Sequence, residues 1–246
     1  MSYKTHTDYL TLRSCDCDLA GAWRPGAMLL AMQEAGEAHS ILLGAGRDDL
    51  LKHNLAWVLT RLEVDLKRYP VIRDKISVET FHAPVRRWFF PRYFVMRDEA
   101  GRVFGRAASL WVLFDLTNRR MVRPENLPVL LPDNSDLPAP LGLPAPVTEV
   151  SGLMTQEVRC PVYTDIDVNG HVNNAKYMDW CCNAIGIEAL EKQELAHFAV
   201  NYDNEARPDD EVRTEFRRLG NEFSYSGFKG DKRCFDIGGT LRERVR

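Results

Sequence analysis

The sequence has no apolar stretch near the roughly 18 residues that a membrane-spanning helix needs. Residues 1–8 contain neither the apolar segment of a signal peptide nor the character of a transit peptide. The 246 residues are 45% hydrophobic and 27% charged, which is enough to bury one large core or two small ones. We therefore expect a soluble globular protein of the cytoplasm with no membrane span, although a processed plastid protein would have the same composition.

The cysteines form no C-x-x-C pair, and two of the six are adjacent, which suits neither a zinc site nor a disulfide framework. We expect them to be reduced and mostly packed. They are Cys15, Cys17, Cys160, Cys181, Cys182 and Cys234. Glu34, Glu37 and His39 lack the H-E-x-x-H spacing of a helical zinc site, so no metal is expected.

Several ligand-binding and catalytic motifs are also missing. The sequence has no G-x-S-x-G serine elbow, no G-x-G-x-x-G loop and no G-x-x-x-x-G-K-[ST] loop, so it indicates neither a serine hydrolase nor a nucleotide cofactor. A net charge of −3 gives no general attraction to nucleic acid. We expect no cofactor and no nucleic-acid partner, and an anionic partner would have to meet a local basic patch.

The hydrophobic pattern divides the chain into two similar series. In the first, a short alternating segment is followed by a helix that begins near Pro25 and ends at Gly44 or Gly46. Four segments rich in β-branched and aromatic residues follow between residues 55 and 115, which predicts an antiparallel meander. Seven prolines then fall between residues 124 and 146, a density typical of a linker.

The second series repeats this order, with a strand at residues 154–162, a turn, a helix to Leu190 and four strands between residues 197 and 242. Residues 16–22 match residues 165–171 at an offset of 149, the separation of Asp18 from Asp167, and keep both aspartates and the glycine. We predict an α+β protein of two tandem domains, each a long helix wrapped by a curled antiparallel sheet. The predicted limits are 1–123 for the first domain, 124–150 for the proline-rich linker and 151–246 for the second domain.

Residues 163–177 combine acidic, amide and imidazole side chains in a turn that opens a helix. Asp167, Asn169 and His171 alternate by two, so an extended backbone would aim them the same way. Asn173 or Asn174 can cap the helix, whose free N–H groups would lie beside His171 and could hold an oxyanion. The plainer interpretation is a turn with a helix cap, because Asp, Asn and Gly are common turn residues.

The first series lacks these reactive groups, since Ala20 and Ala22 stand where the second has Asn169 and His171. If the two series share a fold, only the second keeps the chemistry. The first is then free to serve as the wall of a pocket for an elongated apolar ligand between its helix and strands.

With Asp-Val-Asn-Gly-His-Val-Asn-Asn at residues 167–174, the chain resembles the acyl-acyl carrier protein thioesterases, which are tandem hot-dog enzymes of plants and bacteria. The resemblance covers nearly the whole chain and includes residues 57–61 with 68–70, and residues 106–112, in the family's order. It implies two tandem hot-dog domains. It also implies a thiolester hydrolase that releases free fatty acid from acyl carrier protein and so terminates fatty acid synthesis.

The resemblance implies a catalytic set of Asp167, Asn169, His171 and Glu205, with the glutamate on the strand after the helix. Plant members often have a cysteine directly after this glutamate. Here the residue is Ala206, which speaks against a cysteine nucleophile.

A thioester expels a thiolate whose parent thiol has a pKa of about 8.5, so water activation and oxyanion stabilisation suffice. We hypothesise that Glu205 and His171 orient and deprotonate the water, and that Asn169 and the helix N-terminus hold the carbonyl. Asp167 is expected to fix the turn. The spacing does not decide whether His171 or Glu205 takes the proton.

Met28, Leu29, Met32 and Trp57 are candidates to line the acyl pocket, although such a stripe is equally consistent with plain core. Because acyl carrier protein is acidic, docking calls for a basic surface. The candidate patches are Arg86 with Arg87; Arg119, Arg120 and Arg123; and Arg213, Arg217 and Arg218. A homodimer is possible.

Three other functions stay open. An acyl-coenzyme A thioesterase would use the same residues, because both carriers share the phosphopantetheine arm. A dehydratase or hydratase of the same fold would act on a 3-hydroxyacyl group. A non-catalytic acyl-binding module would leave its ligand intact, which the presence of Asn169, His171 and Glu205 disfavours.

Overall fold

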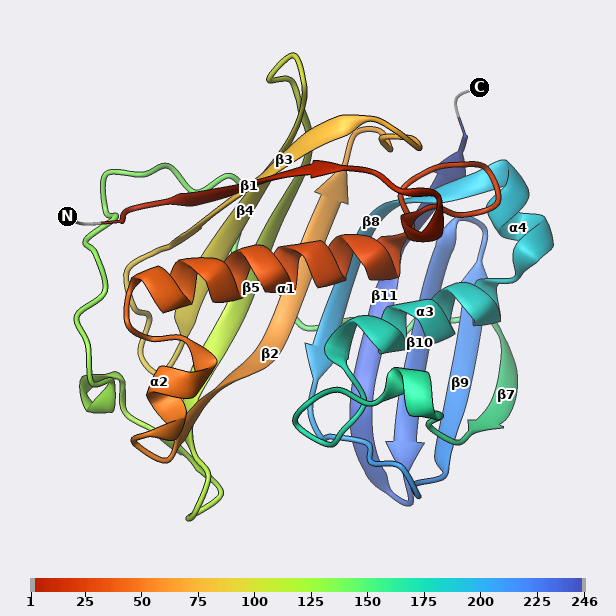
Figure 1. The fold of residues 1–246 in the computed structure, drawn as a ribbon. Helices are drawn as coiled ribbons and strands as arrows, with labels where there is room; N and C mark the ends of the chain where they lie inside the picture. The colour runs from red at the N-terminus through yellow and green to blue at the C-terminus, as the bar shows by residue number, and fades with distance from the viewer. Residues whose placement is uncertain (1–2, 245–246) are drawn as a thin grey trace.

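The computed structural model describes residues 3–244 and contains two matching series of elements (Figure 1). The first comprises β1 (His6–Thr11), η1 (Ser14–Asp16), α1 (Pro25–Leu42), α2 (Arg47–Leu51), β2 (Leu55–Leu66), β3 (Lys75–His82), β4 (Phe90–Asp98), β5 (Val103–Asp115), β6 (Arg120–Val122) and η2 (Pro124–Asn126). The second comprises β7 (Leu153–Arg159), η3 (Tyr163–Asp165), α3 (Asn174–Ile185), α4 (Ile187–Lys192), β8 (Gln193–Tyr202), β9 (Val212–Leu219), β10 (Glu222–Lys229) and β11 (Lys232–Glu243). Strands β1 to β5 thus have counterparts in β7 to β11.

One antiparallel sheet runs through both series in the order β1-β3-β4-β5-β2-β8-β11-β10-β9-β7, with β6 bonded to β5 outside this path. Read from its outer edge, each half has the same strand order. The halves join where β2 pairs with β8, from Arg61 opposite Asn201 to Asp65 opposite His197. The predicted meander was wrong in one respect, because β2 pairs with β5 and β8 instead of β3. This order places the long β2 in the centre of the sheet and leaves the shorter β1 and β7 at the edges.

The two long helices lie on the same face of the sheet (Figure 1). Helix α1 starts with Pro25 at its first position, which suits proline because the helix needs no N–H there, and Gly44 follows its end with φ of +71°. Helix α3 was predicted to continue to Leu190 but ends at Ile185. Gly186 has φ of +91°, outside helical geometry, and Ile187 in α4 is 71% exposed instead of facing the core.

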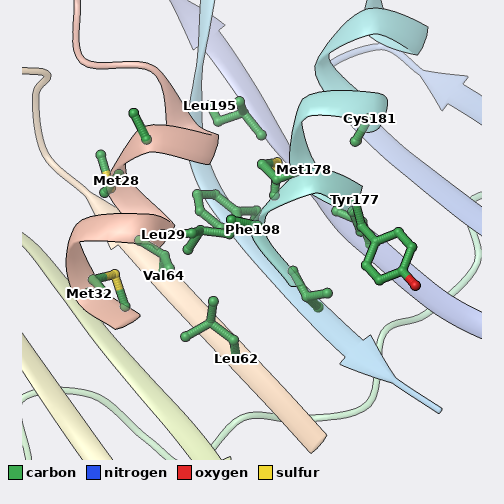
Figure 2. Packing of buried hydrophobic residues seen from close by; sticks show 14 of the residues in the cluster. Met28, Leu29, Met32, Leu62, Val64, Tyr177, Met178, Cys181, Leu195 and Phe198 are labelled. Carbon is green, nitrogen blue, oxygen red and sulfur yellow. The ribbon is translucent and has the colours of Figure 1, made fainter. Parts of the chain in front are cut away.

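The main core lies between these helices and the sheet and spans both halves. Figure 2 shows Met28, Leu29 and Met32 of α1 gathered with Leu62 of β2 and Phe198 of β8. On the other side of this group, Met178 and Cys181 of α3 are also fully buried. Because one apolar cluster includes residues of both helices and both central strands, the two halves share a core.

The proline-rich segment between η2 and β7 contains neither helix nor strand. It is nevertheless packed, because Leu137 and Leu141 lie against Phe81 and Tyr93. The predicted limits of the two domains and the linker stay predictions. Within residues 3–244, no helix is both long and apolar enough to cross a membrane.

Candidate active site

Three of the four predicted site residues lie in the turn between η3 and α3. The Asp167 Oδ1 accepts the Asn169 N–H at 2.8 Å, and the Asp167 backbone N–H donates to the His171 carbonyl at 3.0 Å. Gly170 has φ of +79°, a conformation that glycine adopts without strain, and its N–H donates to the Asp167 carbonyl at 3.0 Å. Asp167 therefore holds the turn closed with Asn169 and His171 on it.

The surroundings of His171 fix which of its ring nitrogens is a base. Its Nδ1 lies 3.3 Å from the Val172 carbonyl oxygen and 3.8 Å from the Asp167 Oδ1. Both neighbours accept hydrogen bonds, so Nδ1 carries the proton in the neutral ring and Nε2 keeps its lone pair. The ring is 27% exposed, so water can reach it.

Glu205 was predicted on a strand but lies in the loop after β8, three residues beyond Tyr202. Pairing of β8 with β11 ends at Tyr202, and the Asp203 and Asn204 N–H groups both donate to the Cys234 carbonyl, which turns the chain away from the sheet. The loop is attached to the turn of Asn169 and His171 because the Val172 N–H donates to the Ala206 carbonyl at 2.8 Å. His171 directly precedes Val172, and Glu205 directly precedes Ala206. The bond therefore brings His171 and Glu205 close together.

Tyr177 of α3 also supports this loop. Its hydroxyl oxygen accepts the Ala206 N–H at 3.2 Å, and its ring stacks on Phe235 with the centroids 4.4 Å apart. Burial raises the pKa of Tyr177, so its hydroxyl stays protonated. Helix α3 therefore fixes both the turn before it and the loop that carries Glu205.

Two arginines bind the same oxygen of Glu205. Arg207 donates to Oε1 from Nε at 3.1 Å and from a terminal nitrogen at 2.5 Å, and Arg119 donates to it at 3.3 Å. Burial raises the pKa of the Glu205 carboxyl, but the bonds from Arg207 and Arg119 and the nearby His171 outweigh it, so the pKa lies below its ordinary value. Glu205 is thus a carboxylate at neutral pH, with Oε2 free of these arginine bonds.

The helix N-terminus is less available than the sequence predicted. Asn173 is the N-cap, as expected, and its side chain accepts the Ala175 N–H at 2.9 Å. Its carbonyl accepts the Lys176 N–H at 2.8 Å. Because the cap already uses these two N–H groups, Asn169 is the better candidate to donate to an oxyanion.

The corresponding turn of the first series has the same backbone and none of the reactive groups. The Asp18 Oδ1 accepts the Ala20 N–H at 2.9 Å, as the Asp167 Oδ1 accepts the Asn169 N–H, and it also accepts the Ala22 N–H at 3.0 Å. Arg244, from the end of the second series, forms an ion pair with Asp18. The Trp23 N–H donates to the Pro70 carbonyl, as the Val172 N–H donates to the Ala206 carbonyl in the second series. Tyr69 therefore occupies the position that corresponds to Glu205. This turn therefore has no pair of imidazole and carboxylate side chains that corresponds to His171 and Glu205.

Sequence reasoning missed Arg47, Arg119 and Arg207. Arg47 donates from Nε to the Asn169 Oδ1 at 3.3 Å, so two of these arginines reach the site from the first series. The contacts of Arg47 and Arg119 join residues that are 122 and 86 positions apart, so no local spacing in the sequence indicates them. Two signals were available, because Arg207 lies two residues after Glu205 and Arg119 belonged to a predicted basic patch.

The predicted acyl-pocket residues do not all come together. Met28, Leu29 and Met32 are buried together on the inner face of α1. Trp57 instead packs in a second cluster with Leu50, and its indole N–H donates to the Ala45 carbonyl at 2.9 Å. A surface hollow of about 400 Å³ lies at α2. It is lined by Glu37, Ile41, Arg47, Asp48 and Asp49, none of which was in the predicted set.

The cysteines are all free, as predicted. Cys181 and Cys234 are buried, Cys17 and Cys182 half-buried, and Cys15 and Cys160 exposed. Burial raises the pKa of Cys182 to about 12 and that of Cys181 well above its ordinary value. These adjacent thiols therefore stay protonated and are poor nucleophiles.

The three basic patches differ in their surroundings. Arg119 contacts Glu205, and its neighbours Arg120 and Arg123 are exposed on the same segment after β5. On β9, Arg213 and Arg217 are paired with acidic residues, namely Glu215 and Glu149. Arg86 and Arg87 lie on the exposed loop between β3 and β4.

Comparison with known families gives two matches that together span most of the chain. The acyl-ACP thioesterase N-terminal domain matches residues 3–126, and the acyl-ACP thioesterase C-terminal domain matches residues 153–230. The palmitoyl-acyl carrier protein thioesterase of Arabidopsis thaliana is 30% identical in an alignment of 213 residues that covers 78% of this chain and 49% of the relative. The oleoyl-acyl carrier protein thioesterase of Coriandrum sativum is 31% identical over 74% of this chain and 54% of its own length. The chain thus spans about half the length of these relatives.

Solved structures show the same architecture. An acyl-ACP thioesterase from Bacteroides thetaiotaomicron superposes with a TM-score of 0.87 at 25% identity, covering 98% of this chain and all of the other. The 12:0-ACP thioesterase from Umbellularia californica gives 0.83 at 23% identity, covering 99% of each chain. These likenesses confirm the predicted tandem hot-dog fold. With both family domains matched in order along it, the chain belongs to the acyl-ACP thioesterase family.

Proposed function

We propose that this protein hydrolyses the thioester of a fatty acyl-acyl carrier protein and releases free fatty acid. The main support is that the turn with the Asn169 amide and the His171 imidazole is bonded to the loop that carries the Glu205 carboxylate. The Val172 to Ala206 backbone bond of 2.8 Å links His171 to Glu205, and the Asp167 carboxylate links Asn169 to the same turn. The family of the chain agrees with this chemistry.

In the proposed reaction, a water molecule donates hydrogen bonds to His171 Nε2 and Glu205 Oε2. Its oxygen attacks the thioester carbonyl carbon, and His171 takes the proton. The low pKa of Glu205 makes its carboxylate a weak base that orients water and stabilises the imidazolium, which favours His171 as the proton acceptor. The negative charge then rests on the former carbonyl oxygen.

Asn169 Nδ2 donates to that oxyanion. The tetrahedral intermediate collapses as the C–S bond breaks, so the acyl group leaves as a carboxylic acid and the carrier leaves as a thiolate. A thiol pKa of about 8.5 makes this departure easy, and the imidazolium returns its proton to the thiolate or to solvent. No covalent acyl-enzyme is needed, in agreement with Ala206 after Glu205 and with the buried Cys181.

For the carrier, we propose docking on the patch formed by Arg119, Arg120 and Arg123. It lies at the site, because Arg119 contacts Glu205, and its positive charge suits an acidic protein. Neutralising Arg120 and Arg123, which make no contact with Glu205, should raise the KM for acyl carrier protein and leave a small thioester unaffected. Added salt should have the same selective effect, and equal losses on both substrates would contradict docking here.

For the acyl tail, we propose that it binds in the first domain near Met28, Leu29 and Met32, which lie together under α1. The cytoplasmic location and a homodimer, both expected from the sequence, also remain proposals. Cell fractionation and sedimentation of the purified protein test them.

The decisive experiment measures free fatty acid from a series of acyl chains on acyl carrier protein and on coenzyme A. We expect faster release from the carrier protein; faster release from coenzyme A would favour the runner-up, an acyl-coenzyme A thioesterase. A changed acyl group on an intact thioester would indicate a hydratase or dehydratase instead. Ligand that binds and stays intact would indicate a binding module.

A further inference from the structure

Arg47 of the first domain touches the candidate catalytic turn of the second. It begins α2, and its Nε donates to the Asn169 Oδ1 at 3.3 Å across 122 residues of sequence. We propose that Arg47 is a positioning residue that holds the Asn169 amide with its NH₂ group toward the thioester carbonyl. The proposal rests on the function proposed above. It adds to the site a residue of the first domain, whose own turn has alanines in place of Asn169 and His171.

Two neighbours of opposite character determine how the amide is oriented. The guanidinium of Arg47 can only donate hydrogen bonds, and the ionised carboxylate of Asp167 can only accept them. The Asn169 Oδ1 faces Arg47, and its Nδ2 lies 3.5 Å from the Asp167 Oδ2. Turning the amide by half a rotation would place donor against donor and acceptor against acceptor. The NH₂ group is therefore held on the side of Asp167, whose Oδ1 lies 3.8 Å from the His171 Nδ1.

Arg47 is fixed well enough to act as such a support. Its backbone N–H donates to the Glu37 Oε1 at 2.8 Å, and its guanidinium pairs with Asp48 at 3.1 Å. The preceding Gly46 allows α2 to pack closely on α1, since a Cβ there would lie only 2.6 Å from the Ile41 Cγ1. The backbone of Arg47 is therefore constrained against α1, and its guanidinium lies between Asp48 and Asn169. A group that orients a catalytic side chain needs such support.

Asn169 needs this support because it is an exposed residue on a turn. An unsupported exposed amide samples several rotamers, and only some of them present the NH₂ group to the reacting oxygen. Misplacing a catalytic group by about 1 Å can cost about 100-fold in rate. Because loss of Arg47 loosens the donor without removing it, we expect a smaller effect, a fall in kcat of about 10-fold.

The test compares Arg47→Met with Lys52→Met in purified full-length protein. Lys52 lies on the next turn, is 70% exposed and pairs only with Asp49, so it matches the lost charge without reaching the site. The substrate is a fatty acyl-acyl carrier protein. We expect Arg47→Met to lower kcat with KM nearly unchanged, Lys52→Met to keep the parent kcat, and Arg47→Lys to recover part of the loss. A change confined to KM, or equal losses in both methionine variants, would overturn the proposal.

A double-mutant cycle with Asn169→Ala separates positioning from a general structural effect. If Arg47 acts through the amide, Arg47→Met has no further effect on kcat once Asn169 is alanine. Multiplicative losses would show that it does not act through Asn169. Full activity of Asn169→Ala would instead remove Asn169 from the proposed mechanism, and the Arg47 proposal with it. A large loss in Asn169→Ala with none in Arg47→Met would refute only the positioning role.

Discussion

Replacing Arg207 with methionine is expected to move the lower of two acidic limbs of the pH–rate profile to higher pH. In the proposed mechanism His171 must be neutral and Glu205 ionised, so each protonation lowers the activity. The lower limb, called the Glu205 limb here, is the loss of activity as the pH falls through the pKa of Glu205. Arg207 and Arg119 hold that pKa below its ordinary value against the opposing effect of burial. Removing Arg207 takes away two of the three bonds to Oε1, so the pKa rises and the limb follows.

The size of the shift follows from the exposure of the pair. The side chain of Arg207 is 57% exposed and that of Glu205 34% exposed, so solvent screens their attraction. Ion pairs of this kind contribute about 0.2–1 kcal/mol. One pKa unit corresponds to about 1.4 kcal/mol, so the pKa of Glu205 is expected to rise by less than one unit.

The assay is kcat/KM for thioester hydrolysis between about pH 3 and pH 8, a range that reaches below the ordinary pKa of glutamate and above that of histidine. A matched control is Arg102→Met, which removes an exposed arginine that pairs with Asp98 away from the site. Its limb should stay in place, and high salt should shrink the shift in Arg207→Met. A Glu205 limb that stays fixed or moves to lower pH in Arg207→Met would refute the role given to Glu205.

Three further predictions concern the frame of the site and the tail pocket. Asn173→Ala removes the N-cap of α3 and should lower the free energy of unfolding by about 1 kcal/mol in denaturant titrations; an unchanged value would contradict the cap. Asp18→Asn breaks the partly buried pair with Arg244 and should cost about 1–3 kcal/mol of stability without lowering kcat, since that turn carries no reactive group. A loss of kcat at intact stability would give the first turn a role in catalysis. Met32→Trp should shift products to shorter fatty acids at a stability cost of about 1–3 kcal/mol, and a folded variant with the same products would argue against a tail pocket there.

Local chemistry made much of the site predictable. The repeat of Asp18 at Asp167 predicted two similar turns, and each carboxylate accepts the N–H group two residues further along the chain. Asn173 caps α3 because an asparagine side chain reaches the N–H group two residues on. These features depend on residues close in sequence, whose contacts the local pattern determines.

Features that depend on distant residues escaped prediction. The pairing of β2 with β5 and β8 is a choice among several strands of similar character. Glu205 left the strand because the Cys234 carbonyl captures the two N–H groups after Tyr202. Trp57 packs away from Met28 because its indole bonds to the Ala45 carbonyl. In each case a long-range partner decided the outcome.

The arginines around the site show the same limit more sharply. Arg47 and Arg119 reach Asn169 and Glu205 from the other domain. No spacing in the sequence links these pairs, because the contact exists only after β2 and β8 join the halves. Interdomain packing therefore adds to the site what the motif alone does not contain.

The central claim is that His171 activates water for thioester hydrolysis, and the most direct measurement is fatty acid release by His171→Ala from a fatty acyl-acyl carrier protein. The matched control is His53→Ala, because His53 is an exposed histidine in the turn after α2. We predict that His171→Ala, with an unchanged circular dichroism spectrum, loses about 100-fold or more in kcat while the control keeps its activity. Parent-like release by a folded His171→Ala protein would contradict the claim.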